Sequence, residues 1–177
     1  THANFGSGDR ICYHGVMDMF RIPKFAASAY ASQQPVEMRP VLEPLTRYTV
    51  GDRAVGGIAP LLICTNCTAV RLIIGEKDLG LFYPAFDRYP GLAHPPVVID
   101  NLPSVWGGGW EDAVFIGYHN SEECITRRFV ANPIAVQLTL TADETKLRAD
   151  IPDAVRFVVR LVDQVGNELP YSSEVVQ

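Results

Sequence analysis

The stretch AVRLIIGEKDLGLFYP, residues 69–84, decides how the chain is expected to fold. Apolar residues recur at every second position from Val70 to Ile74, which is the period of a strand with one face in a core. The segment Gly75-Glu76-Lys77-Asp78 then interrupts the pattern and predicts a turn, and a second apolar stretch follows it. Residues 69–84 therefore predict a β-hairpin.

Similar short strand patterns surround this hairpin, separated by clusters of Gly, Pro, Asn and Asp. Pro44 favours an edge position for the first strand because proline has no N–H to donate, and His119-Asn120-Ser121 predicts a turn within the last pattern. About seven strands within about 100 residues favour an antiparallel immunoglobulin-like β-sandwich over residues 35–133. The other patterns are VLEPLTRYTVGD (41–52), PLLICTN (60–66), PPVVIDNLP (95–103) and EDAVFIGYHNSEECITRRFV (111–130).

The segment HGVMDMFRIPKFAASAYASQQ, residues 14–34, predicts one helix before the sandwich. Pro23 suits the first turn of a helix, where its missing N–H is not needed, and Pro35 disfavours helix at the preceding residue. An apolar stripe at helical spacing needs a partner surface, and we expect it to dock on the sandwich or on a second copy of the chain. Its members are Phe25, Ala26, Ala29 and Tyr30.

Residues 134–177 predict a smaller β unit. The segment 154–171 alternates, with Val155, Phe157, Val159 and Leu161 on one face. A unit of this size does not close a sandwich core of its own, so we interpret it as the truncated start of a second immunoglobulin-like domain. The expected division of the chain is thus residues 1–34, 35–133 and 134–177.

The composition excludes several classes of function. The 177 residues are 47% hydrophobic, which suits a globular chain. The formal net charge is −5 with scattered basic residues, and no apolar run approaches the roughly 20 residues that span a bilayer, so neither nucleic acid nor membrane is an expected partner. The first residues show neither an initiating Met nor a signal peptide. Localisation is left unassigned, with a bacterial cytoplasm favoured over secretion.

The cysteines raise the question of metal or redox chemistry. Cys64 and Cys67 in CTNC have the spacing of a zinc half-site or a redox pair, but the chain has no second CxxC. The segment lies between two predicted strands rather than at the start of a helix. We therefore expect buried or half-buried free thiols, leaving metal or redox chemistry and a disulfide as alternatives.

Several segments in order resemble glycoside hydrolase family 2, the β-galactosidase family. Residues 5–33 resemble the end of its catalytic (β/α)₈ barrel, where a G-[VL]-x-D-x-x-R-x-P-K motif leads into the last barrel helix. Residues 62–80 are similar to the immunoglobulin-like domain that follows the barrel, and residues 140–171 to the start of the next such domain. HPPVVID (94–100) and VWGGGWEDAVFIGY (105–118) also resemble bacterial members. The residues that match the barrel motif are Gly15, Val16, Asp18, Arg21, Pro23 and Lys24.

The resemblance implies that catalysis lies outside this chain. Family enzymes retain configuration, using one Glu as acid/base and another as nucleophile, and both lie on barrel strands upstream of the matched segment. The carboxylate pairs present, Glu111-Asp112 and Glu122-Glu123, are adjacent residues that point to opposite faces of a strand or lie in solvated turns. We expect no catalytic residue, cofactor or metal site here.

A few residues are candidates for contact with sugar. In the family an F-C-x-N-G loop helps to build a cation and sugar-hydroxyl site, and the aligned Ile11-Cys12-Tyr13-His14-Gly15 replaces its Phe and Asn. His14 is then the polar group that contacts substrate in an intact enzyme, with an unliganded loop histidine as the alternative. Trp106 and Trp110 could stack on sugar or cap the sandwich core. For Tyr83 we favour a packing role.

The expected function is that of a non-catalytic C-terminal segment of a retaining β-galactosidase-like enzyme. Its partners would be the rest of the catalytic barrel and, in one arrangement, other copies of the same protein, and it would meet carbohydrate only through that parent. The alternative is a carbohydrate-binding module that targets the enzyme to polysaccharide. An adhesin-type array of immunoglobulin-like domains is disfavoured, because it needs no barrel-type helix at its head.

Overall fold

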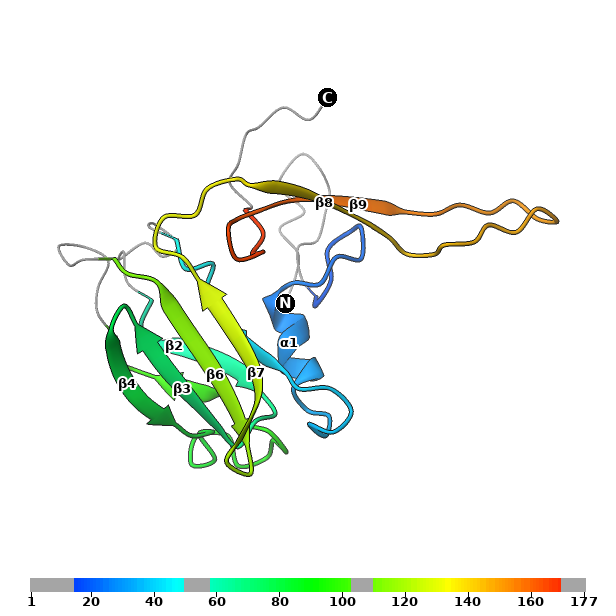
Figure 1. Cartoon of the computed structure of the whole chain (residues 1–177). Helices are drawn as coiled ribbons and strands as arrows, with labels where there is room; N and C mark the ends of the chain where they lie inside the picture. The colour runs from blue at the N-terminus through cyan, green and yellow to red at the C-terminus, as the bar shows by residue number, and fades with distance from the viewer. Residues whose placement is uncertain (1–14, 50–57, 103–109, 170–177) are drawn as a thin grey trace, which may run out of the picture.

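A computed structural model describes residues 15–49, 58–102 and 110–169 of the chain. Two antiparallel sheets face each other, as the sequence predicted (Figure 1). One sheet has the order β1-β2-β5 and the other the order β4-β3-β6-β7. Their strands are β1 (Leu42–Pro44), β2 (Leu61–Thr65), β3 (Ala69–Ile74), β4 (Lys77–Phe82), β5 (Val97–Ile99), β6 (Ala113–His119) and β7 (Glu122–Phe129).

The core lies between the two sheets and follows the two-residue period of the sequence. In β3, Val70 and Leu72 are fully buried while Arg71 between them is partly exposed. Phe115 of β6 is also fully buried and meets Phe129 of β7 edge to face, with ring centroids 5.7 Å apart. The mainly β sandwich is therefore confirmed, and Pro44 lies on the edge strand β1, where it was expected.

Both predicted hairpin turns are present. The β3–β4 turn is shorter than expected, because Lys77 already belongs to β4 and Gly75 alone takes a positive φ of 58°. In the β6–β7 turn, Asn120 and Ser121 have φ of 50° and 70°. Positive φ at both central residues defines a type I′ turn, whose twist matches that of the flanking strands.

A β-bulge interrupts the pairing of β6 with β7 close to that second turn. Gly117 pairs with Ile125 and Tyr118 pairs with Glu123, so Cys124 is left as the extra residue of β7. A bulge bends its strand and changes the direction in which a side chain points. This irregularity sets the position of Cys124.

The helix α1 (Phe25–Ala31) is shorter than the 14–34 stretch that suggested it, and it begins two residues after Pro23. Residues 15–24 form an irregular loop instead, closed by an isolated bridge between Met17 and Pro23. The helix packs against β2 through a half-buried face that includes Phe25, Ala27 and Ser28. The helix thus docks on the sandwich, but with a different face from the predicted one. Of the predicted stripe only Phe25 is half-buried, whereas Ala26 and Ala29 are exposed and Tyr30 is 73% exposed.

Asn66 fixes the segment after the helix to the sandwich. Its side-chain oxygen accepts a hydrogen bond from the amide of Val41 at 2.7 Å. Its side-chain nitrogen donates to the carbonyl oxygens of Gln34 at 3.0 Å and Arg39 at 2.9 Å. Because Asn66 is only 2% exposed, these bonds are shielded from water and hold the β2–β3 connection in one conformation.

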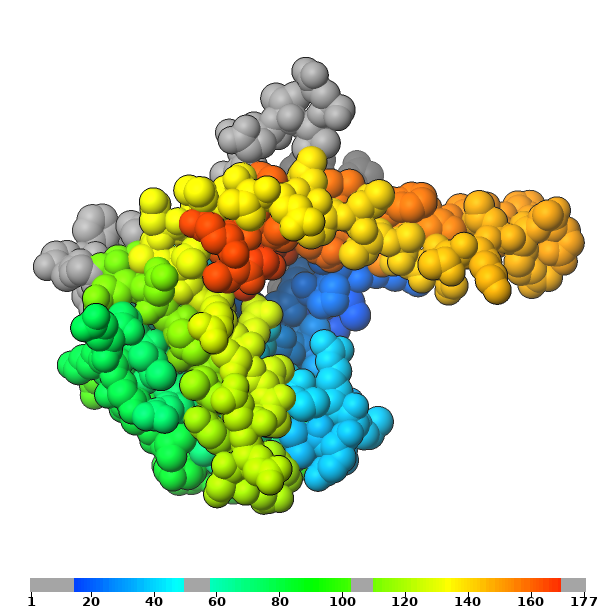
Figure 2. Space-filling view, in the orientation of Figure 1, coloured from blue at the N-terminus to red at the C-terminus, as the bar shows by residue number. Residues whose placement is uncertain are grey.

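The last two strands form a separate ribbon, β8 (Gln137–Ala142) with β9 (Phe157–Val162), which projects beyond the sandwich in Figures 1 and 2. Leu140 pairs with Val159 on one face of this ribbon, and both are mostly exposed. Phe157, expected on a core-facing side, is 61% exposed. A two-stranded ribbon has no second layer to cover its apolar face.

No helix in the described residues has the length and apolar content needed to cross a membrane.

Candidate functional site

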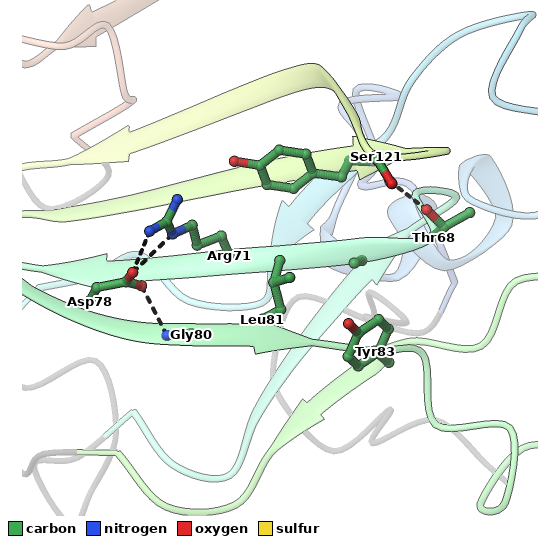
Figure 3. Close-up of a pocket in the computed structure, with 9 residues that line it drawn as sticks. Thr68, Arg71, Asp78, Gly80, Leu81, Tyr83 and Ser121 are labelled. Atoms are coloured by element: carbon green, nitrogen blue, oxygen red, sulfur yellow. Dashed lines mark hydrogen bonds and ion pairs between the residues drawn. The ribbon is translucent and has the colours of Figure 1, made fainter.

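A groove of about 610 Å³ lies on the outer face of the four-stranded sheet (Figure 3). Arg71 of β3 reaches Asp78 of β4, and its Nε lies 3.1 Å from the carboxylate. The backbone amide of Gly80 donates to the other carboxylate oxygen at 2.9 Å. The groove is lined by Thr68, Ala69, Arg71, Asp78, Gly80, Leu81, Tyr83, Tyr118 and Ser121.

The charges in this groove suit binding rather than proton transfer. The hydrogen bond from Arg71 lowers the pKa of Asp78, and the Gly80 amide lowers it further. The carboxylate is therefore ionised at neutral pH, which is the opposite of what a general acid needs. Tyr83 lines the other end of the groove and is 65% exposed, so the packing role favoured for it is wrong (Figure 3).

A second cleft, of about 590 Å³, lies where the three expected divisions of the chain meet. It joins α1 to β1, β7 and the turn after β9, and most of its charged residues are basic. Two ion pairs cross it, Arg127 with Glu43 at 3.8 Å and Arg47 with Glu168 at 3.6 Å. The charged residues of its lining are Lys24, Arg39, Arg47, Arg127, Arg160, Glu43 and Glu168.

Burial dominates the electrostatics of Glu43 in this cleft. Its pKa is raised by desolvation, even though Arg127 and Arg47 act in the opposite direction. On the other side, Arg47 also lies over the ring of Phe25, 4.9 Å from its centroid. Asn167 donates to the carbonyl oxygen of Arg128 at 2.8 Å. The helix, the sandwich and the third division are thus joined through one polar cleft.

The predicted sugar-contact residues are only partly within the described structure. His14 and Trp106 lie outside the described residues. Trp110 stacks on Tyr48, with ring centroids 4.3 Å apart and an interplanar angle of 24°, and it packs against the core while half-buried. This position corresponds to the core-capping alternative, and sugar contact by Trp110 stays a prediction.

The adjacent carboxylates are held in separate structural contacts. Asp112 accepts a hydrogen bond from the amide of Ala131 at 2.7 Å. Glu123 accepts one from the hydroxyl of Thr126 at 2.7 Å, and Glu122 is exposed beside the β6–β7 turn. Among the described residues, no three His, Cys, Asp or Glu side chains are grouped to hold a metal ion.

The described cysteines are free thiols, as the sequence predicted. Cys64 and Cys67 are buried and Cys124 is half-buried. The unexpected feature is that the Sγ atoms of Cys67 and Cys124 lie 3.4 Å apart. The two residues are 57 positions apart, and only the register of β7 could have indicated their approach.

Comparison with known proteins gives a consistent result, although no protein-family model matches the chain. It is 45% identical to a beta-galactosidase of Thermoanaerobacterium thermosulfurigenes over 184 residues, which is 100% of this chain and 26% of that protein. It is 38% identical to a beta-galactosidase of Rhizobium meliloti over 162 residues, 87% of this chain and 21% of that protein. The chain thus spans about a quarter of the length of these curated relatives.

Solved structures share the fold. A beta-glycosidase from Bacteroides vulgatus superposes on 93% of this chain with a TM-score of 0.63 at 20% identity, over 19% of its own length. A beta-glucuronidase from glycoside hydrolase family 2 superposes on 89% of this chain with a TM-score of 0.61 at 21% identity, over 15% of its own length. At these identities the likeness concerns the arrangement of strands and helix.

Proposed function

Because this chain resembles part of a glycoside hydrolase family 2 β-galactosidase along its whole length, we propose that it is a non-catalytic segment of such an enzyme. One observation carries the proposal. The whole of this chain is 45% identical to a beta-galactosidase, but the match spans only 26% of that beta-galactosidase. The intact enzyme would hydrolyse terminal β-galactosides with catalytic carboxylates supplied by its barrel. This chain would brace that barrel or an oligomer contact.

The cleft described above supports a bracing role. It joins the helix, which resembles the last barrel helix, to both β units through the ion pairs Arg127–Glu43 and Arg47–Glu168. Polar contacts of this kind fix orientation more than they add affinity. They would set the angle at which the sandwich meets the barrel.

The ribbon of β8 and β9 supports the same role. One face carries Leu138, Leu140, Phe157 and Val159 in solvent. At about 25 cal/mol per Å², covering such a face releases several kcal/mol, so a longer protein that continues the second sandwich gains stability there. The apolar face would then be an internal surface of the parent enzyme.

The test uses the full-length enzyme from which the chain derives. Leu140→Glu places a charge on the apolar face of the ribbon, whereas Thr141→Glu places the same charge on the opposite face. We expect Leu140→Glu to lower the Tm of the enzyme or dissociate it, with the KM for a chromogenic galactoside unchanged in the protein that stays folded. Thr141→Glu should change neither. Equal effects of the two variants would contradict the bracing role.

Two measurements on the 177-residue chain separate this proposal from its alternatives. The isolated chain should not turn over a chromogenic β-galactoside, and turnover by the purified chain would overturn its non-catalytic assignment. Calorimetric titration with galactan should show millimolar or no affinity. Tight binding would favour a carbohydrate-binding module instead.

A further inference from the structure

Two cysteines from distant parts of the sandwich meet at one end of the four-stranded sheet. Cys67 lies in the connection between β2 and β3, and Cys124 lies in the edge strand β7. Their Sγ atoms are 3.4 Å apart, close to van der Waals contact for two sulfurs. A disulfide has an S–S distance of about 2.05 Å, so each sulfur needs to move by only about 0.7 Å.

The β-bulge brings Cys124 to this position. Because Cys124 is the extra residue of the bulge, both it and the following Ile125 are partly buried, although successive residues of a regular strand point to opposite faces. Ile125 packs against the core, and the thiol of Cys124 lies 3.4 Å from the carbonyl oxygen of Gly117.

Gly117 provides the space for the pair. A Cβ atom at Gly117 would lie 2.6 Å from Sγ of Cys67 and 2.8 Å from a methyl carbon of Ile125. Any larger residue there would push the Cys67 sulfur away. The missing side chain of Gly117 therefore allows Cys67 to reach the edge strand.

The backbone around Cys67 is held in place, which keeps the two sulfurs together. The amide of Cys67 donates to the hydroxyl of Thr65 at 3.0 Å, and the neighbouring Asn66 is fixed by its buried hydrogen bonds. A pair of thiols held at this separation loses little conformational freedom on joining.

We propose that Cys67 and Cys124 form a redox-sensitive thiol pair, which closes to a disulfide with a small-molecule disulfide such as oxidised glutathione. The thiolate of the half-buried Cys124 attacks one sulfur of the oxidant, forming a mixed disulfide and releasing one glutathione thiolate. The thiolate of Cys67 then attacks Sγ of Cys124 and displaces the second glutathione. The two cysteines lose two protons and two electrons, and the oxidant is reduced to two thiols. This inference does not depend on the proposed enzyme parentage.

The pair differs from the one that the sequence suggests. Cys64 and Cys67 share the CTNC spacing, but Cys64 is buried in the central strand β2 of the other sheet, and the described sulfur in contact with Cys67 is that of Cys124. Burial raises the pKa of Cys67 to about 12. Closure is therefore expected to be slow at neutral pH, with the mixed disulfide at Cys124 as the intermediate that accumulates.

The test incubates the full chain in glutathione buffers of increasing oxidised fraction, blocks the remaining thiols and maps peptides by mass spectrometry without reduction. We expect a peptide that links Cys67 to Cys124 and disappears on reduction. Thermal unfolding of the oxidised chain should occur roughly 5–10 °C above that of the reduced chain, because the link closes a long loop. Cys64→Ala should retain both effects and Cys124→Ser should lose both.

The mapping on the wild-type chain decides the question even if a variant does not fold. Glutathione that still occupies Cys124 without closure once the mixture has reached equilibrium, or a link that involves Cys64 or Cys12, would overturn the proposal. So would a rise in Tm on oxidation that persists in a folded Cys124→Ser chain.

Discussion

Removing the hydroxyl of Tyr48 tests how much one buried side chain contributes to the stability of the sandwich. Tyr48 is 1% exposed, stacks on Trp110 and donates a hydrogen bond of 2.7 Å to the backbone carbonyl of Glu111. Tyr48→Phe keeps the ring and its contacts with Trp110 and Phe129 but removes the donor. The variant therefore isolates the hydrogen bond from the packing.

The expected loss follows from the burial of the Tyr48 side chain. Removing the donor of a part-buried hydrogen bond such as this one costs about 1–2 kcal/mol. For a chain of this length each kcal/mol changes Tm by about 2–4 °C, so Tyr48→Phe should melt about 2–8 °C lower than the wild type. Urea unfolding, followed by tryptophan fluorescence, should show a lower midpoint with an unchanged slope.

The pH dependence gives a second, independent signature. Burial raises the pKa of Tyr48, with Asp112 and Glu111 adding to the shift. Since the folded-state pKa is above the unfolded value of 10.0, the contribution of the hydroxyl is complete below that pH and is lost as the pH rises towards the folded-state pKa. The difference in the free energy of unfolding between the wild type and Tyr48→Phe should therefore become smaller at alkaline pH.

Tyr83→Phe is the matched control, because Tyr83 is exposed in the groove of Figure 3 and should change stability by less than about 0.5 kcal/mol. The assigned role of the hydroxyl is refuted if Tyr48→Phe unfolds at the same urea concentration as the wild type. It is also refuted if Tyr48→Phe and Tyr83→Phe lose the same amount of stability.

Two other substitutions probe the cleft and the bulge. Burial raises the folded-state pKa of Glu43 above its ordinary 4.5, so its stabilising contribution is complete below that pH and is lost as the pH rises through the folded-state pKa. Glu43→Gln should therefore be at least as stable as the wild type at neutral pH, and lower stability in urea there would contradict this. Gly117→Ala places a Cβ 2.6 Å from the Cys67 sulfur and should cost about 1–3 kcal/mol by urea denaturation. A Cβ atom at Gly91 would meet nothing within 4 Å, so Gly91→Ala should not change the stability. An equal loss of stability in the two variants would show that the close fit at Gly117 is unimportant.

The sequence predicts the sandwich well because each strand and turn has a recognisable pattern within a few residues. The alternation around Val70 and Leu72, Pro44 on an edge strand and the turn at Asn120-Ser121 all correspond to the structure. These features depend on the strand period and on turn chemistry, which act over a few residues. Local pattern was therefore sufficient for the fold class.

The features that local pattern missed depend on tertiary register. The approach of Cys67 to Cys124 follows from a one-residue bulge, which no alternation of apolar residues shows. The ion pair of Arg71 and Asp78 follows from how β3 folds back on β4. The helix is shorter than the 14–34 stretch that suggested it, because residues 15–24 close a loop through Asp18, whose carboxylate accepts amide hydrogen bonds at 2.8 Å.

The buried amide of Asn66 has a consequence for how this protein can be produced. An acceptor sequence for N-linked glycosylation is formed by Asn66, Cys67 and Thr68. The nitrogen that would carry the glycan already donates two hydrogen bonds inside the fold, where a sugar has no room. In a eukaryotic secretory host, transfer of a glycan to the nascent chain would block the native packing of the β2–β3 connection. Bacterial expression, or removal of the acceptor by Thr68→Ala, avoids that misfolded product.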